Sequence, residues 1–319
     1  MIEWNGGIKL LSKPIWFDSA VYGEICLITS ARIKDAFRFR RGVSSHQTYC
    51  LLQALSPTFR CLRLPYGAWM EVGGIRLSLL PSGFMPGASL VLAEVDNKRF
   101  LFINRIVLDA VLWEKAVVPR ADVLAVVTPY GSSQYSFHSR KEIYDTIVSK
   151  AQDSIKSGQS PIFLTSAIGK AQEVTKILLD NGFDVVVHKS IARVCNAYKA
   201  IGVTIGKWKV FRGRLGAHQV LVFPDHLTHS SAIKNVINRR LIWLSGMAVN
   251  KSAREVLGVD EGICLSGYPD IPGLVKLVAL SHAKKVYLIG HNMDDALTEL
   301  KKKGVETHSI RWERQMTLF

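Results

Sequence analysis

Cationic and aromatic side chains alternate in one short stretch of this 319-residue sequence, residues 207–214, which read KWKVFRGR. Lysine and arginine neutralise phosphates, and an aromatic face stacks on an unpaired base for about 1–3 kcal/mol. The stretch therefore indicates a surface for nucleic acid, and the residues we expect to carry it are Lys207, Trp208, Lys209, Arg212 and Arg214. The alternation also fits an ordinary strand whose aromatic side chains face the core, and in that case its cations alone would form the binding surface.

The whole chain is basic, with 41 Lys and Arg against 26 Asp and Glu and a formal net charge of +15. Such an excess favours a polyanionic partner, either nucleic acid or an acidic protein. The five cysteines are scattered without a CxxC, which indicates reduced thiols and excludes a zinc knuckle. The N-terminus has no signal-peptide pattern, and no apolar run approaches the ~20 residues that span a bilayer. We therefore expect a cytoplasmic protein without a membrane partner.

Four segments carry motif-like residue patterns in a fixed order. They are 81–89 (PSGFMPGAS), 121–131 (ADVLAVVTPYG), 166–173 (SAIGKAQE) and 266–270 (SGYPD). They resemble the PAGHxxGSA, ADVLxxExTYG, GKAQE and SDHAD segments of the metallo-β-lactamase/β-CASP nucleases, and the resemblance covers most of the chain. Among these nucleases, the chain is most similar to the messenger-RNA 3′-end-processing and ligase-associated exonuclease proteins.

The resemblance implies a site for two divalent metals, where His and carboxylate ligands hold a hydroxide that attacks a phosphodiester. The residues at the ligand positions here are Ser30, Arg32, Lys34 and Asp35, then Phe84, Asn104-Arg105, Val127, Gly267, Tyr268 and Gly290, which is followed by His291. Arginine has no lone pair to donate, and phenylalanine and valine cannot ligate. Asp270 alone matches clearly, so we expect no metal, no other cofactor and no catalytic residue.

Three cations, Arg32, Lys34 and Arg105, fall where the family holds its metals. One hypothesis is that they still dock a phosphate without cleaving it, because the planar fork of arginine grips phosphate oxygens in pairs. The alternative is drift after loss of function, with these side chains pointing into solvent. Lys170 offers a further phosphate contact at the start of a helix. The sequence there is not a Walker loop, so an ordinary helix start is favoured.

The last residues, QMTLF, resemble the start of the archaeal QxxLF peptides that dock on the PCNA sliding clamp. In such a peptide Gln315 would bond at the rim of an apolar pocket that Leu318 and Phe319 fill. A tail folded onto its own core explains the same residues equally well. Elsewhere, His226 and His229 are spaced like a ligand pair, but we expect ordinary surface histidines.

The hydrophobic periodicity predicts how these residues are positioned. Strands are expected at 25–29, 75–80, 89–95, 100–103 and 123–127, followed by a helix–strand alternation at 139–157, 161–165, 169–180, 183–188 and 191–200. This alternation indicates a parallel sheet. Together with the resemblance, it predicts an α/β fold: an αββα metallo-β-lactamase-like sandwich from residues 1–131 and 241–319. A β-CASP-like α/β insertion at 132–240 and a tail at 311–319 complete the prediction.

Three functions follow as hypotheses. The first is a non-catalytic, nuclease-like protein that binds nucleic acid in DNA repair, replication or RNA processing. PCNA, an active nuclease paralogue or a ligase would be its protein partner. The second is an active, metal-dependent β-CASP nuclease with a non-standard site. The third is a structural partner subunit of an active paralogue, whose basic surface meets an acidic protein. The sequence does not choose between DNA and RNA.

Overall fold

The computed structural model describes residues 2–4, 7–10, 13, 15–19, 24–32 and 41–311. The chain divides into two units. The first consists of Met1–Tyr49, Thr58–Ser136 and Gly267–Phe319, and the second of Cys50–Pro57 and Phe137–Ser266. The chain therefore enters the second unit twice, briefly at 50–57 and then at 137–266, and returns to the first unit each time.

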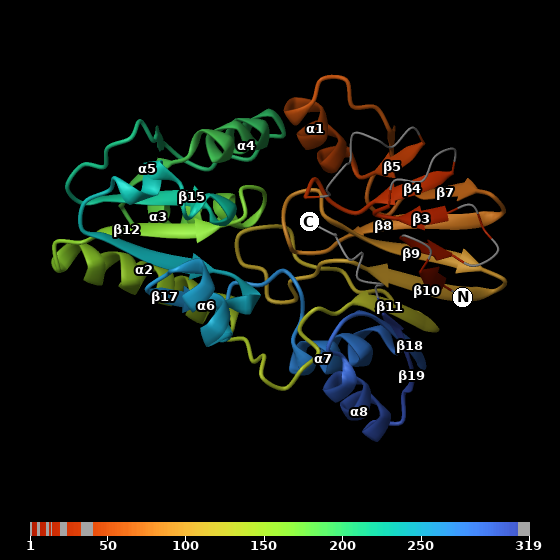
Figure 1. Cartoon of the computed structure of the whole chain (residues 1–319). Coiled ribbons are helices and arrows are strands. Elements are labelled where there is room, and N and C mark those ends of the chain that lie inside the picture. Colours follow the sequence, from red (N-terminus) through yellow and green to blue (C-terminus); the bar gives the residue numbers. More distant parts are fainter. Residues whose placement is uncertain are drawn as a thin grey trace, which may run out of the picture. The chain divides into compact units, whose positions relative to one another are not determined.

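Two sheets make up the first unit (Figure 1). One sheet runs in the order β1 (Ile2–Trp4), β2 (Ile8–Leu10), β3 (Ile15–Phe17), β4 (Ile25–Ile28), β5 (Gly42–Ser44) and β6 (Leu62–Arg63). The other runs in the order β19 (Glu306–Arg311), β18 (Lys285–Gly290), β11 (Val123–Val127), β10 (Lys98–Ile103), β9 (Ser89–Val95), β8 (Ile75–Pro81) and β7 (Trp69–Val72). The strands predicted at 75–80, 89–95, 100–103 and 123–127 are thus confirmed.

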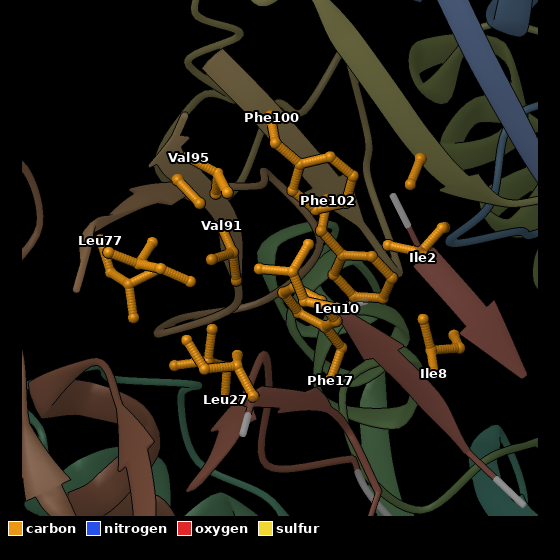
Figure 2. Packing of buried hydrophobic residues seen from close by; sticks show 14 of the residues in the cluster. Ile2, Ile8, Leu10, Phe17, Leu27, Leu77, Val91, Val95, Phe100 and Phe102 are labelled. Carbon is orange, nitrogen blue, oxygen red and sulfur yellow. The ribbon is translucent and has the colours of Figure 1, made fainter. Parts of the chain in front are cut away.

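One hydrophobic core joins these two sheets. Figure 2 shows Phe17 of β3 against Phe102 of β10, and their ring centroids are 4.2 Å apart in a stacked pair. Residues at alternate positions of β10 point the other way, so Leu101 packs with the helices α7 (Ile271–Ser281) and α8 (Asp294–Lys302). The central strands β9, β10 and β11 of the second sheet are therefore buried on both faces, which explains why they are nearly continuous apolar runs. The architecture is mixed α/β, as predicted.

The second unit holds a six-stranded sheet in which every pair of neighbours is parallel, as predicted from the helix–strand alternation. Its order is β14 (Lys209–Val210), β13 (Asp184–Val187), β15 (Gln219–Pro224), β12 (Ser160–Thr165), β16 (Arg239–Leu244) and β17 (Glu261–Ile263). Helices α2 (Arg140–Lys156), α3 (Lys170–Asp180) and α4 (Lys189–Ala200) pack against its strands. None of the helices that the structure describes is long and apolar enough to cross a bilayer.

The second unit continues past residue 240, where the sequence placed its end. Strand β16 pairs with β12, and β17 pairs with β16, so residues 241–266 join the parallel sheet. The corrected boundary lies between Ser266 and Gly267. A buried strand such as β16 has the same apolar composition in either sheet, and its sequence therefore could not show which sheet it joins.

Candidate functional site

Strands from both sheets of the first unit end around the carboxylate of Asp18. Thr29, which follows β4, donates its backbone N–H to Oδ1 of Asp18 at 2.7 Å and its hydroxyl to Oδ2 at 2.5 Å. Asn104, which follows β10, donates its side-chain amide to the same Oδ2. We call the residues gathered at these strand ends the strand-end cluster: Asp18, Thr29, Ser30, Phe84, Asn104, Arg105, Gly267 and Tyr268.

Arg105 lies between two aromatic rings of this cluster. Its guanidinium carbon is 4.9 Å from the ring centroid of Tyr268 and 5.6 Å from that of Phe84, which is cation–π geometry. Phe84 is fully buried, and a Cβ added to Gly267 would lie 2.5 Å from its ring. Phe84, which stands where the resemblance places a metal ligand, therefore packs on the backbone of Gly267 and against the guanidinium of Arg105.

Burial raises the pKa of Asp18, although its hydrogen bonds to Thr29 and Asn104 and the charge of Arg105 act in the opposite direction. The carboxylate already accepts three hydrogen bonds. The nearby hydroxyl of Ser30 is buried and has no hydrogen-bond partner in the described part of the chain. One engaged carboxylate and one hydroxyl do not fit a dinuclear metal centre, which needs several free donors.

This poor fit extends beyond the cluster. Within residues 2–4, 7–10, 13, 15–19, 24–32 and 41–311, no three His, Cys, Asp or Glu side chains gather as a metal site. Asp270, the one matching family position, accepts a hydrogen bond from the N–H of Gly273 at 2.9 Å and caps α7. Lys34 and Asp35 lie outside the described residues, and Arg32 is half-buried in the turn after β4.

The raised pKa of Asp18 makes the stability of the chain depend on pH. The folded chain binds this proton more tightly than the unfolded chain, so Asp18 favours folding at low pH. That contribution is lost as the pH rises from the ordinary value of 3.8 through the raised value. We therefore expect D18N to lose less stability than the wild type as the pH rises through this window. Urea unfolding at a series of pH values measures the slopes, with the exposed D145N as control, and identical slopes for D18N and the wild type would contradict the expectation.

The segment 166–173 starts helix α3 in the second unit and has internal partners. The N–H of Gly169 donates to Oε1 of Gln172 at 2.8 Å, at a φ of 87° that suits glycine. Lys170 is 5% exposed, and its ammonium donates to the carbonyls of Leu244 and Leu265 at 3.0 and 3.3 Å. These contacts favour the ordinary helix start over a phosphate site, because the ammonium of Lys170 is already engaged below the surface.

Glu173, the last residue of that segment, forms a buried ion pair that the sequence did not reveal. Its Oε1 lies 2.7 Å from Nε of Arg140 and accepts the hydroxyl of Tyr144 at 2.7 Å. Arg140 also donates to the carbonyl of Ser266 at 2.7 Å. Glu173 of α3 thus binds Arg140 of α2, which in turn binds Ser266, the last residue of the second unit. These contacts give the segment a structural role.

The predicted nucleic-acid segment 207–214 lies along β14, at one edge of the parallel sheet. Phe211 packs edge-on against Phe223 with centroids 6.0 Å apart, and Lys209 pairs with Asp184 at 2.6 Å. Trp208 is half-buried. The remaining cations are exposed and have no carboxylate partner in the part of the chain that the structure describes, namely Lys207, Arg212 and Arg214. Phe211 thus faces the core, as in the alternative in which the segment is an ordinary strand. The three exposed cations can still bind an anion.

The structure describes the predicted histidine pair but not the predicted clamp-binding residues. His226 and His229 are both exposed, as expected of surface histidines. Gln315, Leu318 and Phe319 lie outside the described residues. His188 was not among the predicted site residues. It ends the strand predicted at 183–188, and its Nδ1 lies 2.8 Å from the hydroxyl of Ser190. Its position at a strand end was the signal that could have found it.

The chain is similar to several known proteins at low identity. No protein-family model matches the chain. A protein called "Probable DNA ligase" from Opitutus terrae is 20% identical over 321 residues, which cover 99% of this chain and 32% of that protein. RNase aCSPSF2 from Saccharolobus solfataricus is 22% identical over 177 residues, or 54% of this chain and 35% of that protein. The ribonucleases among the relatives indicate the metallo-β-lactamase/β-CASP superfamily at low identity.

The match thus spans only about a third of the length of these two relatives. The names of these two relatives, a probable DNA ligase and an RNase, describe proteins that act on nucleic acid. A crystal structure of a protein of unknown function from Enterococcus faecalis V583 shares the fold, with a TM-score of 0.59 and 12% identity over 89% of this chain and 78% of that one.

Proposed function

We propose that this chain is a nuclease-like protein that binds nucleic acid and does not cleave it. In this proposal the first unit is a metallo-β-lactamase-like sandwich and the second a β-CASP-like insertion. The observation that carries the proposal is the packing of Arg105 between Phe84 and Tyr268 beside the engaged carboxylate of Asp18. A guanidinium keeps positive charge at the strand ends but activates no water, so substrate phosphates would be attracted and not hydrolysed.

The binding half of the proposal rests on charge and on the relatives. The net charge of +15 and the exposed cations of 207–214 suit a polyanion, and the half-buried Trp208 lies among them. The named relatives are ribonucleases and a probable DNA ligase. Nucleic acid therefore explains the basic surface better than an acidic protein does.

Fluorescence anisotropy of labelled oligonucleotides tests this function. Single-stranded DNA and RNA of about 20 nucleotides and the matching duplexes are titrated at several salt concentrations. We expect binding whose logarithmic affinity falls linearly with the logarithm of salt, with a slope near −0.7 per phosphate contacted on a single strand. Absence of binding at low salt would contradict the proposal and favour a structural subunit that meets an acidic protein.

Protein partners form a further part of the proposal. Nearly the whole chain aligns with about a third of a probable DNA ligase, and we therefore propose that this chain acts beside a ligase. We also propose that Gln315, Leu318 and Phe319 attach it to a PCNA clamp, because they match the QxxLF pattern. Pull-downs with a ligase and a clamp from the same organism, with and without the last five residues, test both partners separately.

A further inference from the structure

Three neighbouring strands of the second unit end side by side at the carboxyl edge of its sheet. Val187 of β13 is in register with Val210 of β14 and Val222 of β15, so the residues that follow these positions are neighbours. His188 lies edge-on against Phe223 with centroids 4.6 Å apart, and Phe223 in turn meets Phe211. His188 and Phe211 are half-exposed. The edge thus presents aromatic faces that are partly open to solvent.

Basic groups surround these rings without acidic partners. Lys189, Arg212 and His226 are exposed, and none of them forms an ion pair with a carboxylate among the residues that the structure describes. Asp225 precedes His226 in the chain, and its carboxylate accepts the backbone N–H of His226 and forms no ion pair with the imidazole in the described part of the chain. Burial lowers the pKa of His188, and the charges of Lys189 and His226 lower it further. Lys189 and His226 therefore lie near enough to His188 to disfavour its protonated form, and a bound anion would offset that repulsion.

We infer that His188, Lys189, Arg212 and His226, together called the β13–β15 edge, bind a phosphate of a nucleic-acid strand whose base stacks on the neighbouring rings. Arginine and lysine suit phosphate oxygens, and partly exposed rings suit an unpaired base. Open α/β sheets also bind ligands at the carboxyl ends of their strands. The inference rests on the proposed function and names a site in the second unit for one part of the bound strand.

Binding at this edge has a proton signature. The hydroxyl of Ser190 lies 2.8 Å from Nδ1 of His188, and the ring of Phe223 packs edge-on against the imidazole. The charges of Lys189 in α4 and of His226 after β15 lower its pKa, and Asp225 and Arg212 follow the ends of the neighbouring strands β15 and β14. A phosphate beside the ring stabilises the imidazolium, so its binding raises the pKa of His188 and takes up a proton. Affinity at this edge should therefore increase as the pH falls from about 7.5 to about 5.5.

Two experiments test the site. In the first, histidine C–H signals are followed by NMR over a range of pH with and without inorganic pyrophosphate. We expect pyrophosphate to raise the pKa of His188 and to leave the signals of the exposed His138 unchanged. In the second, the oligonucleotide affinity of K189Q/H226Q is compared with that of H138Q/K156Q. The second pair changes one histidine and one lysine elsewhere in the same unit. We expect K189Q/H226Q to weaken binding about fivefold or more at low pH and less at high pH, and the control pair less than about twofold.

The outcomes separate this inference from the proposed function. If the wild type binds oligonucleotides and K189Q/H226Q has the same affinity as H138Q/K156Q, the phosphate site at the β13–β15 edge is contradicted but the proposed function is not. An NMR titration without any change at His188 also overturns the edge. A pyrophosphate response at His188 in a chain that binds no oligonucleotide supports a phosphate site and overturns the proposed function. Oligonucleotides with and without a 5′ phosphate then show whether a terminal or an internal phosphate is bound.

Discussion

Replacing Glu173 by alanine is expected to lower the free energy of unfolding by about 3–5 kcal/mol. Glu173 and Arg140 are 1% and 5% exposed, and the ion pair between them is 2.7 Å long. Alanine would leave the guanidinium charge buried without its partner, and the hydroxyl of Tyr144 would lose its acceptor. The cost of an uncompensated buried charge is larger than that of most single substitutions in a core.

Urea unfolding followed by circular dichroism measures this loss. The matched control is E255A, because Glu255 is 65% exposed and its pair with Lys251 at 3.9 Å is on the surface of α6 (Lys251–Leu257), where we expect a change within about 0.5 kcal/mol. Removing both charges in R140M/E173L should recover most of the loss, since neither charge is then left unpaired. A loss below about 1 kcal/mol for E173A would show that Arg140 is solvated or compensated elsewhere.

The second large effect concerns nucleic-acid binding. The variant K207Q/R212Q/R214Q removes three exposed cations from the segment along β14. If each contacts one phosphate of a single strand, the salt slope should become less negative by about 2, and affinity at low salt should fall about tenfold or more. The side chains are exposed, so we expect the stability of the fold to change little.

Lys209→Gln provides the control for that variant. Lys209 lies in the same segment, but its ammonium pairs with Asp184 at 2.6 Å, and its removal should alter the salt slope much less. Anisotropy titrations over a range of salt concentrations give both slopes. An unchanged slope in the triple variant would place the phosphate contacts elsewhere on the chain.

Local signals were sufficient where neighbouring residues decide the structure. The capping box at the start of α2 involves two residues only: the hydroxyl of Ser139 accepts the N–H of Glu142, and the carboxylate of Glu142 accepts the N–H of Ser139. The tight turn between β9 and β10 contains Asp96 and Asn97, both with positive φ, which these residue types favour in hairpins. These features depend on a few adjacent residues, and the sequence therefore predicts them well.

Long-range contacts decided what the sequence could not show. Strands β1, β2 and β3 have only three residues each, too few for a periodic pattern, yet they build part of the first sheet. Asp18 meets Asn104 across 86 positions of the chain, and no local pattern marks that pair. The sequence alone showed which residue types stand at the family's ligand positions. It could not show that Arg105 stacks on Tyr268, because the two residues are brought together only by the fold.

We propose that the strand-end cluster does not hold a pair of metal ions, because Phe84, Arg105 and Tyr268 fill it. The most direct test is the metal content of the purified full chain after incubation with zinc and with manganese and removal of unbound ions, measured by mass spectrometry. The residues around Asp18 and Arg105 predict much less than one ion per chain. Two tightly held ions per chain, lost on replacing Asp18 by alanine, would contradict the claim and make the chain a metal-dependent nuclease candidate.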